Sequence, residues 1–299
     1  MFCSVIGGFA LENGKMMPLV QPSEVFIIGG AAIGTLLIAN PFDLLKKTCR
    51  ALLRVFHGPV PTKKFYLSTM VMLHSLFEFA RRNGASKLED QLDHPENSVV
   101  FRRHAAVIRH IGALDFICDT LRLTTLGQIA PFELYMMLEQ DFETRRRESA
   151  APAAVVAFLA DALPGLGILS AVLGVVITMG SVTELPKIIG QKVGAALVGT
   201  FLGIFLAYGF VAPLAAHLER ISDAELQYYQ ILRNSIAAFA RGMPVGIALE
   251  FGRRSIPPEL RPGFIEMEEE CRRASGKVVE MPLPLVSKET LQTPLRSAG

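Results

Sequence analysis

Three stretches of the chain carry no charged residue over a length close to that of a membrane span. They are residues 25–42, with 18 positions, 162–183, with 22, and 193–216, with 24. A helix rises about 1.5 Å per residue, so about 20 apolar residues cross a hydrocarbon core of about 30 Å. The pattern predicts at least three transmembrane helices. The connector 184–192 is short, so the last two should form an antiparallel hairpin.

The N-terminal residues 1–11 are also apolar, but as a helix they would measure only about 16 Å, which is too short to cross. They lack the basic region and the cleavage site of a signal peptide. We interpret them as the second half of a transmembrane helix whose beginning is absent from this sequence, as a misassigned start codon would produce. A short interfacial helix is the alternative.

The polar parts of the chain show the 3.6-residue period of amphipathic helices. Asn83-Gly84 should end the first of them, and Pro152 should break the chain just before the next span. No stretch alternates with period two for long enough to predict a sheet. The predicted amphipathic helices are 63–82, 105–126 and 131–148.

These elements predict an all-α membrane protein with four transmembrane helices, the first one truncated, and a helical cytoplasmic domain. The expected regions are helices 1 and 2 in 1–42, a cytoplasmic loop in 43–151, helices 3 and 4 in 152–216, a cytoplasmic helical tail in 217–280 and a disordered end in 281–299.

Charge sets the predicted orientation. Only 19% of the residues are charged and 51% are hydrophobic, and of the 30 Lys and Arg residues 16 fall in 41–150 and 11 in 217–299. Basic residues near helix ends stay on the cytoplasmic side. We therefore expect 41–150 and 217–299 to be cytoplasmic, in a multi-pass protein of the bacterial inner membrane.

Other classes of protein find little support. The four cysteines lie far apart without a CxxC pair, which argues against a zinc site or a disulfide framework. No P-loop, HExxH, GxSxG or dinucleotide-binding fingerprint occurs. We expect no enzyme activity, no catalytic residue, no cofactor and no metal. A net charge of +2 gives no indication of nucleic acid as a partner.

The predicted spans offer no titratable group in their interior. Glu24 should lie at the outer start of the second span and Asp161 at the cytoplasmic end of the third. The interior polar groups are hydroxyls, which cannot bind and release a proton near neutral pH; they belong to Ser170, Thr178, Thr200 and Tyr208. The chain is therefore either no ion conductor or one half of a conductor whose carboxylate comes from another subunit.

Pro164 and Pro213 each remove a backbone donor and should kink their helices. We expect both kinks at a similar depth near the cytoplasm, where they could form a hinge; tolerated kinks without a function are the alternative. Small residues four apart, as in Gly30–Gly34 and Gly199–Gly203, allow close helix packing.

The sequence resembles the MotA family of flagellar stator proteins over nearly its whole length. The stretches that carry the resemblance are LPGLGILSAVLGVV (163–176), VGTFLGIFLAYGFVAPLA (198–215) and RPGFIEMEE (261–269), supported by QPSEVFIIGGAAIG (21–34) and LDFICDTLRL (114–123). The resemblance implies a ring of these subunits around a smaller single-span partner, MotB, which carries the proton-binding Asp. Ion flow would then drive the larger subunit against the rotor protein FliG, within membrane lipids.

The resemblance also assigns roles to residues. Pro164 and Pro213 match the family's functional prolines, and Thr200 and Ala171 match residues that face the ion path. Tyr208 and Asp161 complete the expected pathway set.

In the cytoplasmic loop, Arg81 and Glu89 match the rotor-contacting charges. Without the family, both would be interpreted as parts of a solvated helix face.

Two other functions remain open from the residues. The first is a proton-driven energiser of outer-membrane processes, of the ExbB or TolQ kind, which would have fewer spans and a different loop order. The second is a secondary transporter or membrane enzyme, although transporters usually keep polar groups at mid-membrane and these spans have few.

Overall fold

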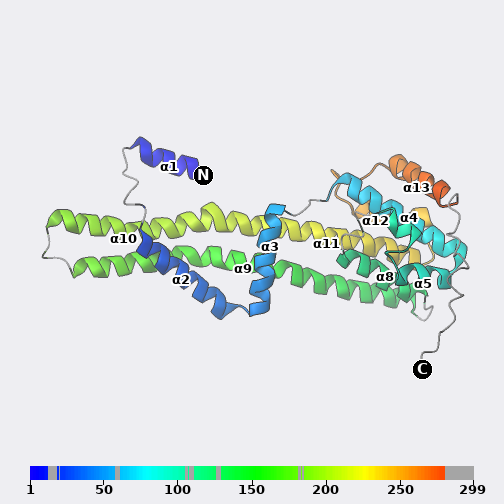
Figure 1. Cartoon of the computed structure of the whole chain (residues 1–299), viewed down its shortest axis with the longest axis horizontal. Coiled ribbons are helices and arrows are strands. Elements are labelled where there is room, and N and C mark those ends of the chain that lie inside the picture. The colour runs from blue at the N-terminus through cyan, green and yellow to red at the C-terminus, as the bar shows by residue number, and fades with distance from the viewer. Residues whose placement is uncertain are drawn as a thin grey trace, which may run out of the picture. The chain divides into compact units, whose positions relative to one another are not determined.

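The computed structural model of the chain describes residues 1–12, 19, 21–57, 61–104, 107, 111–125, 129–180, 183 and 185–279, and no strand occurs among them. They form two compact units (Figure 1). The first unit consists of Met1–Pro61 and Phe132–Gln230, and the second of Thr62–Pro131 and Ile231–Gly299. The all-helical class predicted from the sequence is confirmed for the described residues.

The first unit contains the apolar helices. Three are long and apolar enough to cross a membrane, in α2, in α9 and in the run from α10 into α11. The ten-residue α1 falls short of that length, so a fourth span is not confirmed. The helices are α1 (Phe2–Leu11), α2 (Pro22–Ala39), α3 (Phe42–His57), α9 (Pro131–Met179), α10 (Pro186–Leu206), the π-helical η2 (Ala207–Val211) and the start of α11 (Ala212–Ala240).

The break predicted at Pro152 is wrong, because α9 runs without interruption for 49 residues through both Pro152 and Pro164. A proline inside a helix removes one backbone hydrogen bond, and neighbouring helices can offset that loss. Here Ala153 and Val156 are buried against Ala215 of α11, which holds the helix together beyond the proline.

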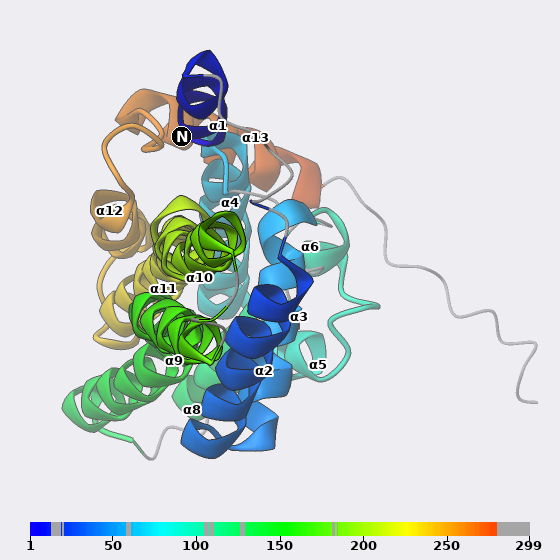
Figure 2. The ribbon, with the colours of Figure 1, turned by 90° about the vertical axis from the view of Figure 1, so that its left-hand side faces the viewer.

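The predicted antiparallel hairpin is confirmed. The end of α9 and the start of α10 lie side by side along their length in Figure 1, and Figure 2 looks along them with α2 beside the pair. Ile28 of α2 packs with Leu163 of α9 and Ala207 of η2 in one buried cluster. Three helices therefore share one packed core in the first unit.

The second unit is built from amphipathic helices. Its first helix begins at the Thr62 cap, whose hydroxyl accepts from the Phe65 amide, and ends at Gly84, which has a φ of +82°. This confirms the helix and the stop predicted from Asn83-Gly84. The helices are α4 (Lys63–Asn83), α5 (Ala85–Asp93), α6 (Val99–Arg102), α8 (Ile111–Thr125), the end of α11, α12 (Val245–Ser255) and α13 (Phe264–Val279).

One core contact of the second unit joins α4 to α11. The ring of Phe77 stacks on that of Phe239, with centroids 4.2 Å apart and planes within 2°. Of the helix predicted over 105–126, residues 111–125 form α8. The remainder of that range, apart from Val107, and the predicted disordered end 281–299 lie outside the described residues.

Candidate functional site

The backbones of α9 and α10 approach each other more closely than side chains would allow. A Cβ placed on Gly167 would stand 2.9 Å from the Gly203 Cα, and one on Gly203 would stand 2.7 Å from the Leu163 carbonyl oxygen. No real Cβ comes so near to backbone, so both positions require glycine. Of the two GxxxG pairs in the sequence, Gly199–Gly203 makes this contact, whereas Gly30 and Gly34 meet nothing within 4 Å.

A carboxylate is buried about one helical turn from this contact. Glu24, in the first turn of α2, is only 6% exposed. The Ser170 hydroxyl of α9 donates a hydrogen bond to its Oε2 atom. The same carboxylate occupies the space beside Gly199 of α10 that a Cβ would need. One acidic side chain therefore joins all three apolar helices.

The depth of Glu24 corrects the sequence interpretation, which placed this residue at the outer start of a span and no acid in the interior. Its partner Ser170 lies eight residues inside the uncharged run 162–183, about 12 Å from its nearer end. The N-terminus of α2 thus packs against the middle of the α9–α10 hairpin. The sequence placed Glu24 correctly in the first turn of α2. The position of α2 along α9 and α10 differs from the expectation.

Ala171 and Thr200, expected along the ion path, lie next to this carboxylate. Ala171 is buried, and its backbone nitrogen would stand 3.2 Å from a Cβ on Gly199. Thr200 follows Gly199 and is half-buried. The structure therefore brings Ala171, Thr200 and Glu24 together at one level of the helix pair.

The two prolines do not lie at the same depth. Gly203 packs between Leu163 and Gly167, which places it level with Pro164. Pro213 is two residues from Ala215, which belongs to one buried cluster with Val156, eight residues before Pro164 in α9. Pro213 lies two residues nearer to the Pro164 level than Ala215 does, so the prolines are offset along the pair by about 9 Å, and the expected common depth is wrong.

A π-helical turn directly precedes Pro213. In η2, the amide of Ala212 donates to the carbonyl of Ala207, five residues earlier. Because Pro213 can neither donate to a preceding carbonyl nor tolerate one close to its ring, a wider turn before it relieves the conflict. Such π turns often mark functional sites in helices.

The other two expected pathway residues lie outside the buried cluster. Tyr208, within η2, is 61% exposed, and Asp161 of α9 is also exposed. Neither belongs to the buried contact made by Glu24. On a membrane-spanning unit, exposed positions face lipid or another chain.

The expected rotor residues belong to the second unit. Arg81 lies in the last turn of α4 and Glu89 in α5, on either side of Gly84, and both are exposed. Their neighbour Arg82 instead pairs with Glu78, with 3.1 Å between Nε and Oε2. The structure places Arg81 and Glu89 on consecutive surface helices.

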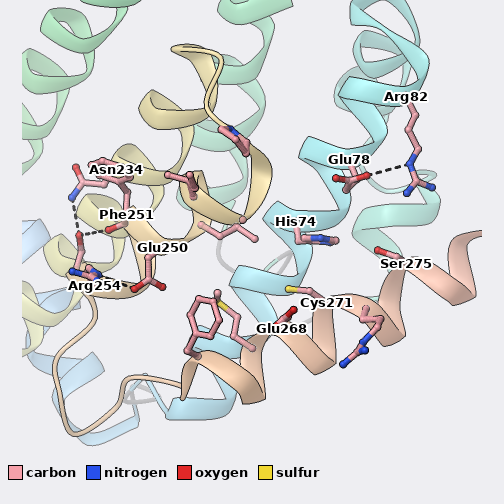
Figure 3. Close-up of a pocket in the computed structure, with 18 residues that line it drawn as sticks. His74, Glu78, Arg82, Asn234, Glu250, Phe251, Arg254, Glu268, Cys271 and Ser275 are labelled. Atoms are coloured by element: carbon pink, nitrogen blue, oxygen red, sulfur yellow. Dashed lines mark hydrogen bonds and ion pairs between the residues drawn. The ribbon is translucent and has the colours of Figure 1, made fainter.

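A groove of about 990 Å³ opens between α4, α12 and α13 in the second unit. Figure 3 shows its charged residues, with Glu78 and Arg82 on α4 and Glu250 and Arg254 on α12. Burial lowers the pKa of the His74 imidazole, which also lines the groove. Hydrogen bonds from Arg253 and, less strongly, Arg254 lower the pKa of Glu250 to about 2.

Sequence reasoning missed the placement of Glu24 and its bond to Ser170. The available signal was the acid in QPSEVFIIGG, directly before an uncharged run. An acid at the start of a membrane helix is ordinary when that start lies at the membrane surface. Only the packing of α2 against α9 and α10 reveals the burial.

Comparison with known proteins agrees with the resemblance. Residues 1–84 match the model of "Motility protein A N-terminal", and residues 113–231 match that of the "MotA/TolQ/ExbB proton channel family". "Motility protein A" of Salmonella typhimurium is 35% identical over 269 residues, covering 90% of this chain and 91% of that protein. The chain belongs to the motility protein A family. Glu24 and Arg81 fall in the first matched region, and Ser170 and Thr200 in the second.

Two solved structures share the fold. The C. jejuni MotAB structure aligns with a TM-score of 0.70 at 17% identity, over 86% of this chain and 92% of that one. The flagellar MotAB stator complex from Bacillus subtilis aligns with a TM-score of 0.67 at 21% identity, over 87% and 94%. The match to an N-terminal model specific to motility proteins favours this family over the ExbB and TolQ members of the wider group.

Proposed function

We propose that this chain is the larger stator subunit of a bacterial flagellar motor, which uses proton flow to turn a rotor together with a single-span, MotB-like partner. The relative and the solved complexes named above support this role. The chain has no catalytic function in this proposal. Several copies form a ring around the partner, and the ring stands in the lipids of the inner membrane.

The observation that carries the proposal is the carboxylate of Glu24, which is buried between α2, α9 and α10. Glu24 is held by Ser170 at the level of Ala171 and Thr200, about one helical turn from the backbone contact of Gly167 with Gly203. A fixed polar group inside an apolar bundle is the usual mark of an ion route. The uncharged runs of α9 and α10 offer only hydroxyls besides it, so the mobile proton needs an Asp from the partner.

The proposed cycle begins when the partner Asp binds a proton near Thr200 and Ala171. A charged Asp at mid-membrane costs about 3 kcal/mol on insertion scales. Its neutralisation can therefore shift a packing equilibrium of a few kcal/mol. Glu24 stays bound to Ser170 and keeps α2 seated while α9 and α10 adjust.

We propose that the change in the packing of α9 and α10 reaches the cytoplasm through the helix segments at Pro164 and Pro213. Pro164 acts level with the Gly203 contact, and Pro213 acts directly after the π-helical turn, about 9 Å further along. Tyr208 and Asp161, which are exposed, line the outer surface toward the partner or a neighbouring subunit. Arg81 and Glu89 then engage the rotor protein FliG, because complementary charges raise encounter rates and fix register.

The proposed topology has four spans, with α1 in the first, and residues 43–151 and 217–299 lie in the cytoplasm. The concentration of Lys and Arg in those regions supports it. Proton use is favoured over sodium because the route is sparsely polar.

Two experiments measure swimming speed and the amount of each variant in the membrane. The first tests the hinge. Pro164→Leu should stop swimming at a normal membrane level, while Pro152→Leu, the other proline inside α9, should leave swimming intact. Normal swimming of Pro164→Leu would remove the hinge.

Arg81→Glu should impair swimming without loss of assembly, because Arg81 is exposed. Arg102→Glu, an exposed arginine of α6 in the same unit, is the control and should swim normally. Equal swimming of the two variants would remove the rotor role.

A further inference from the structure

The helix α3 presents three different surfaces around its axis. The first is buried: Ala51, Leu52 and Val55 pack against a cluster that includes Ala153 of α9 and Ala215 of α11. Thr48, on the same surface, is also buried. This surface fixes how α3 is rotated about its axis in the first unit, so the direction of the other two surfaces follows.

One edge of the buried surface points toward the charged end of α9. Lys47 Nζ lies 3.6 Å from Glu148 Oε2, and Glu148 directly follows the arginine run 145–147. That part of α9 precedes the uncharged run 162–183. The Lys47 edge of α3 therefore faces away from the apolar part of the bundle.

The opposite edge carries exposed apolar side chains. Phe42 is 78% exposed and Leu53 is 68% exposed. At about 100° per residue, these two positions lie about 120–140° around the helix from Lys47 along the side that does not pack on the bundle. This edge is directed along α9 toward its uncharged run, where hydrocarbon surrounds a membrane-spanning helix. Cys49 is exposed between the two positions.

The remaining surface is basic and turned outward from the bundle. Lys46, Arg50 and Arg54 repeat every four residues along one face, and all three are exposed. Asp43, at the start of the helix, is the acidic residue on this face. The order around α3 is thus a packed surface, an apolar edge and then a cationic face. This is the order of a helix that lies in the boundary of a bilayer with anionic headgroups.

We propose that α3 binds the phosphate groups of anionic phospholipids through Lys46, Arg50 and Arg54 while Phe42 and Leu53 insert among the upper acyl chains. The helix directly follows α2, from which Asn40 and Pro41 separate it, so it stands where a spanning helix leaves the membrane. Long basic side chains reach the phosphate level while their apolar stems stay against the acyl boundary. The inference rests on the membrane location of the first unit and requires neither ion flow nor a rotor.

The test uses the stator complex purified with its partner in detergent and supplied with equal amounts of phosphatidylglycerol and phosphatidylcholine, and it counts bound lipid by mass spectrometry. The wild-type complex should retain at least about fivefold more phosphatidylglycerol. The triple variant Lys46→Gln, Arg50→Gln, Arg54→Gln should lose this preference, since three basic residues together are expected to account for about 100-fold in affinity. Equal retention of the two lipids by the wild type would overturn the proposal.

The matched control removes three exposed charges from the second unit, with Lys64→Gln, Lys87→Gln and Arg102→Gln, and should keep the preference. If both triple variants lose it alike, net charge explains the effect and the α3 site is wrong. Phe42→Ser with Leu53→Ser should also reduce retention of both lipids, because the insertion is lost.

Two further measurements use the wild-type complex alone. Raising salt to about 1 M should remove the preference in the wild type, since exposed charges are screened. Glycerol 3-phosphate at a matched phosphate concentration should not displace the lipid. Displacement would identify a site for free phosphate esters and would refute the lipid assignment.

Discussion

The contact between α9 and α10 and the contact between α4 and α11 join helices in opposite ways. In the first, Gly167 and Gly203 let the backbones touch, and the polar pair of Glu24 and Ser170 is buried beside them. In the second, the large rings of Phe77 and Phe239 stack on each other. Water drives large apolar side chains together, whereas lipid does not, so membrane helices depend on close approach and polar contacts.

The largest effect should come from the aromatic contact. Phe77→Ala removes a fully buried ring and should lower the free energy of unfolding by about 3–5 kcal/mol. Phe251→Ala, which truncates a 46% exposed ring of the groove, is the control and should change stability far less. Thermal unfolding of the purified chain in detergent measures both. Equal losses would mean that the Phe77 stack does not hold the second unit.

The glycine contact should be nearly as sensitive to one added methyl group. Gly203→Ala places a Cβ 2.7 Å from the Leu163 carbonyl oxygen and should cost about 1–3 kcal/mol through overpacking. Gly194→Ala, in the same helix, meets nothing within 4 Å and should be neutral. The comparison uses the same unfolding assay. A neutral Gly203→Ala would contradict the close approach of α9 and α10.

Two variants of Glu24 distinguish a role of the Glu24–Ser170 pair in stability from a role in function. Glu24→Ala leaves the buried Ser170 hydroxyl without its acceptor and should cost about 1–3 kcal/mol. Glu24→Gln keeps an acceptor for Ser170 and should assemble nearly normally, but it removes the charge. Because the carboxylate belongs to the proposed ion route, Glu24→Gln should swim poorly at a normal membrane level. Normal swimming of Glu24→Gln would reduce Glu24 to a packing role.

The smallest effect concerns the groove of the second unit. Hydrogen bonds from Arg253 and Arg254 lower the folded-state pKa of Glu250 to about 2, below its usual value of 4.5. A lowered pKa stabilises the fold above the unfolded pKa, and that stability is lost as the pH falls from about 4.5 toward 2. Wild type should exceed Glu250→Gln in unfolding temperature at pH 6, and the difference should shrink by pH 3. A constant difference would contradict the pairing.

The sequence correctly predicted the features that depend on a single segment of the chain. The uncharged runs indicated the spans, Asn83-Gly84 indicated the end of α4, and the short connector indicated the hairpin. Segments of the chain also indicated the family, because long stretches such as 163–176 and 198–215 match in order. Residues of the candidate path, Ala171 and Thr200, came from that resemblance, and the structure places them at one level of the helix pair.

What the sequence did not reveal depends on the level of one helix against another. Pro152 was expected to end a helix, but packing of Ala153 on α11 carries α9 through it. Glu24 was expected at a membrane surface, but the placement of α2 buries it at Ser170. The prolines were expected at one depth, but the register of α9 on α10 separates them. Relative register arises from tertiary packing and leaves no local pattern in one sequence.

The most direct test of the account is proton leakage in vesicles. The purified chain alone, reconstituted under an imposed pH gradient, should leave that gradient standing, because Glu24 is bound to Ser170 and the runs of α9 and α10 hold no other acid. Addition of the single-span partner with its membrane Asp should permit proton flow. Dissipation of the gradient by the chain alone would contradict the account.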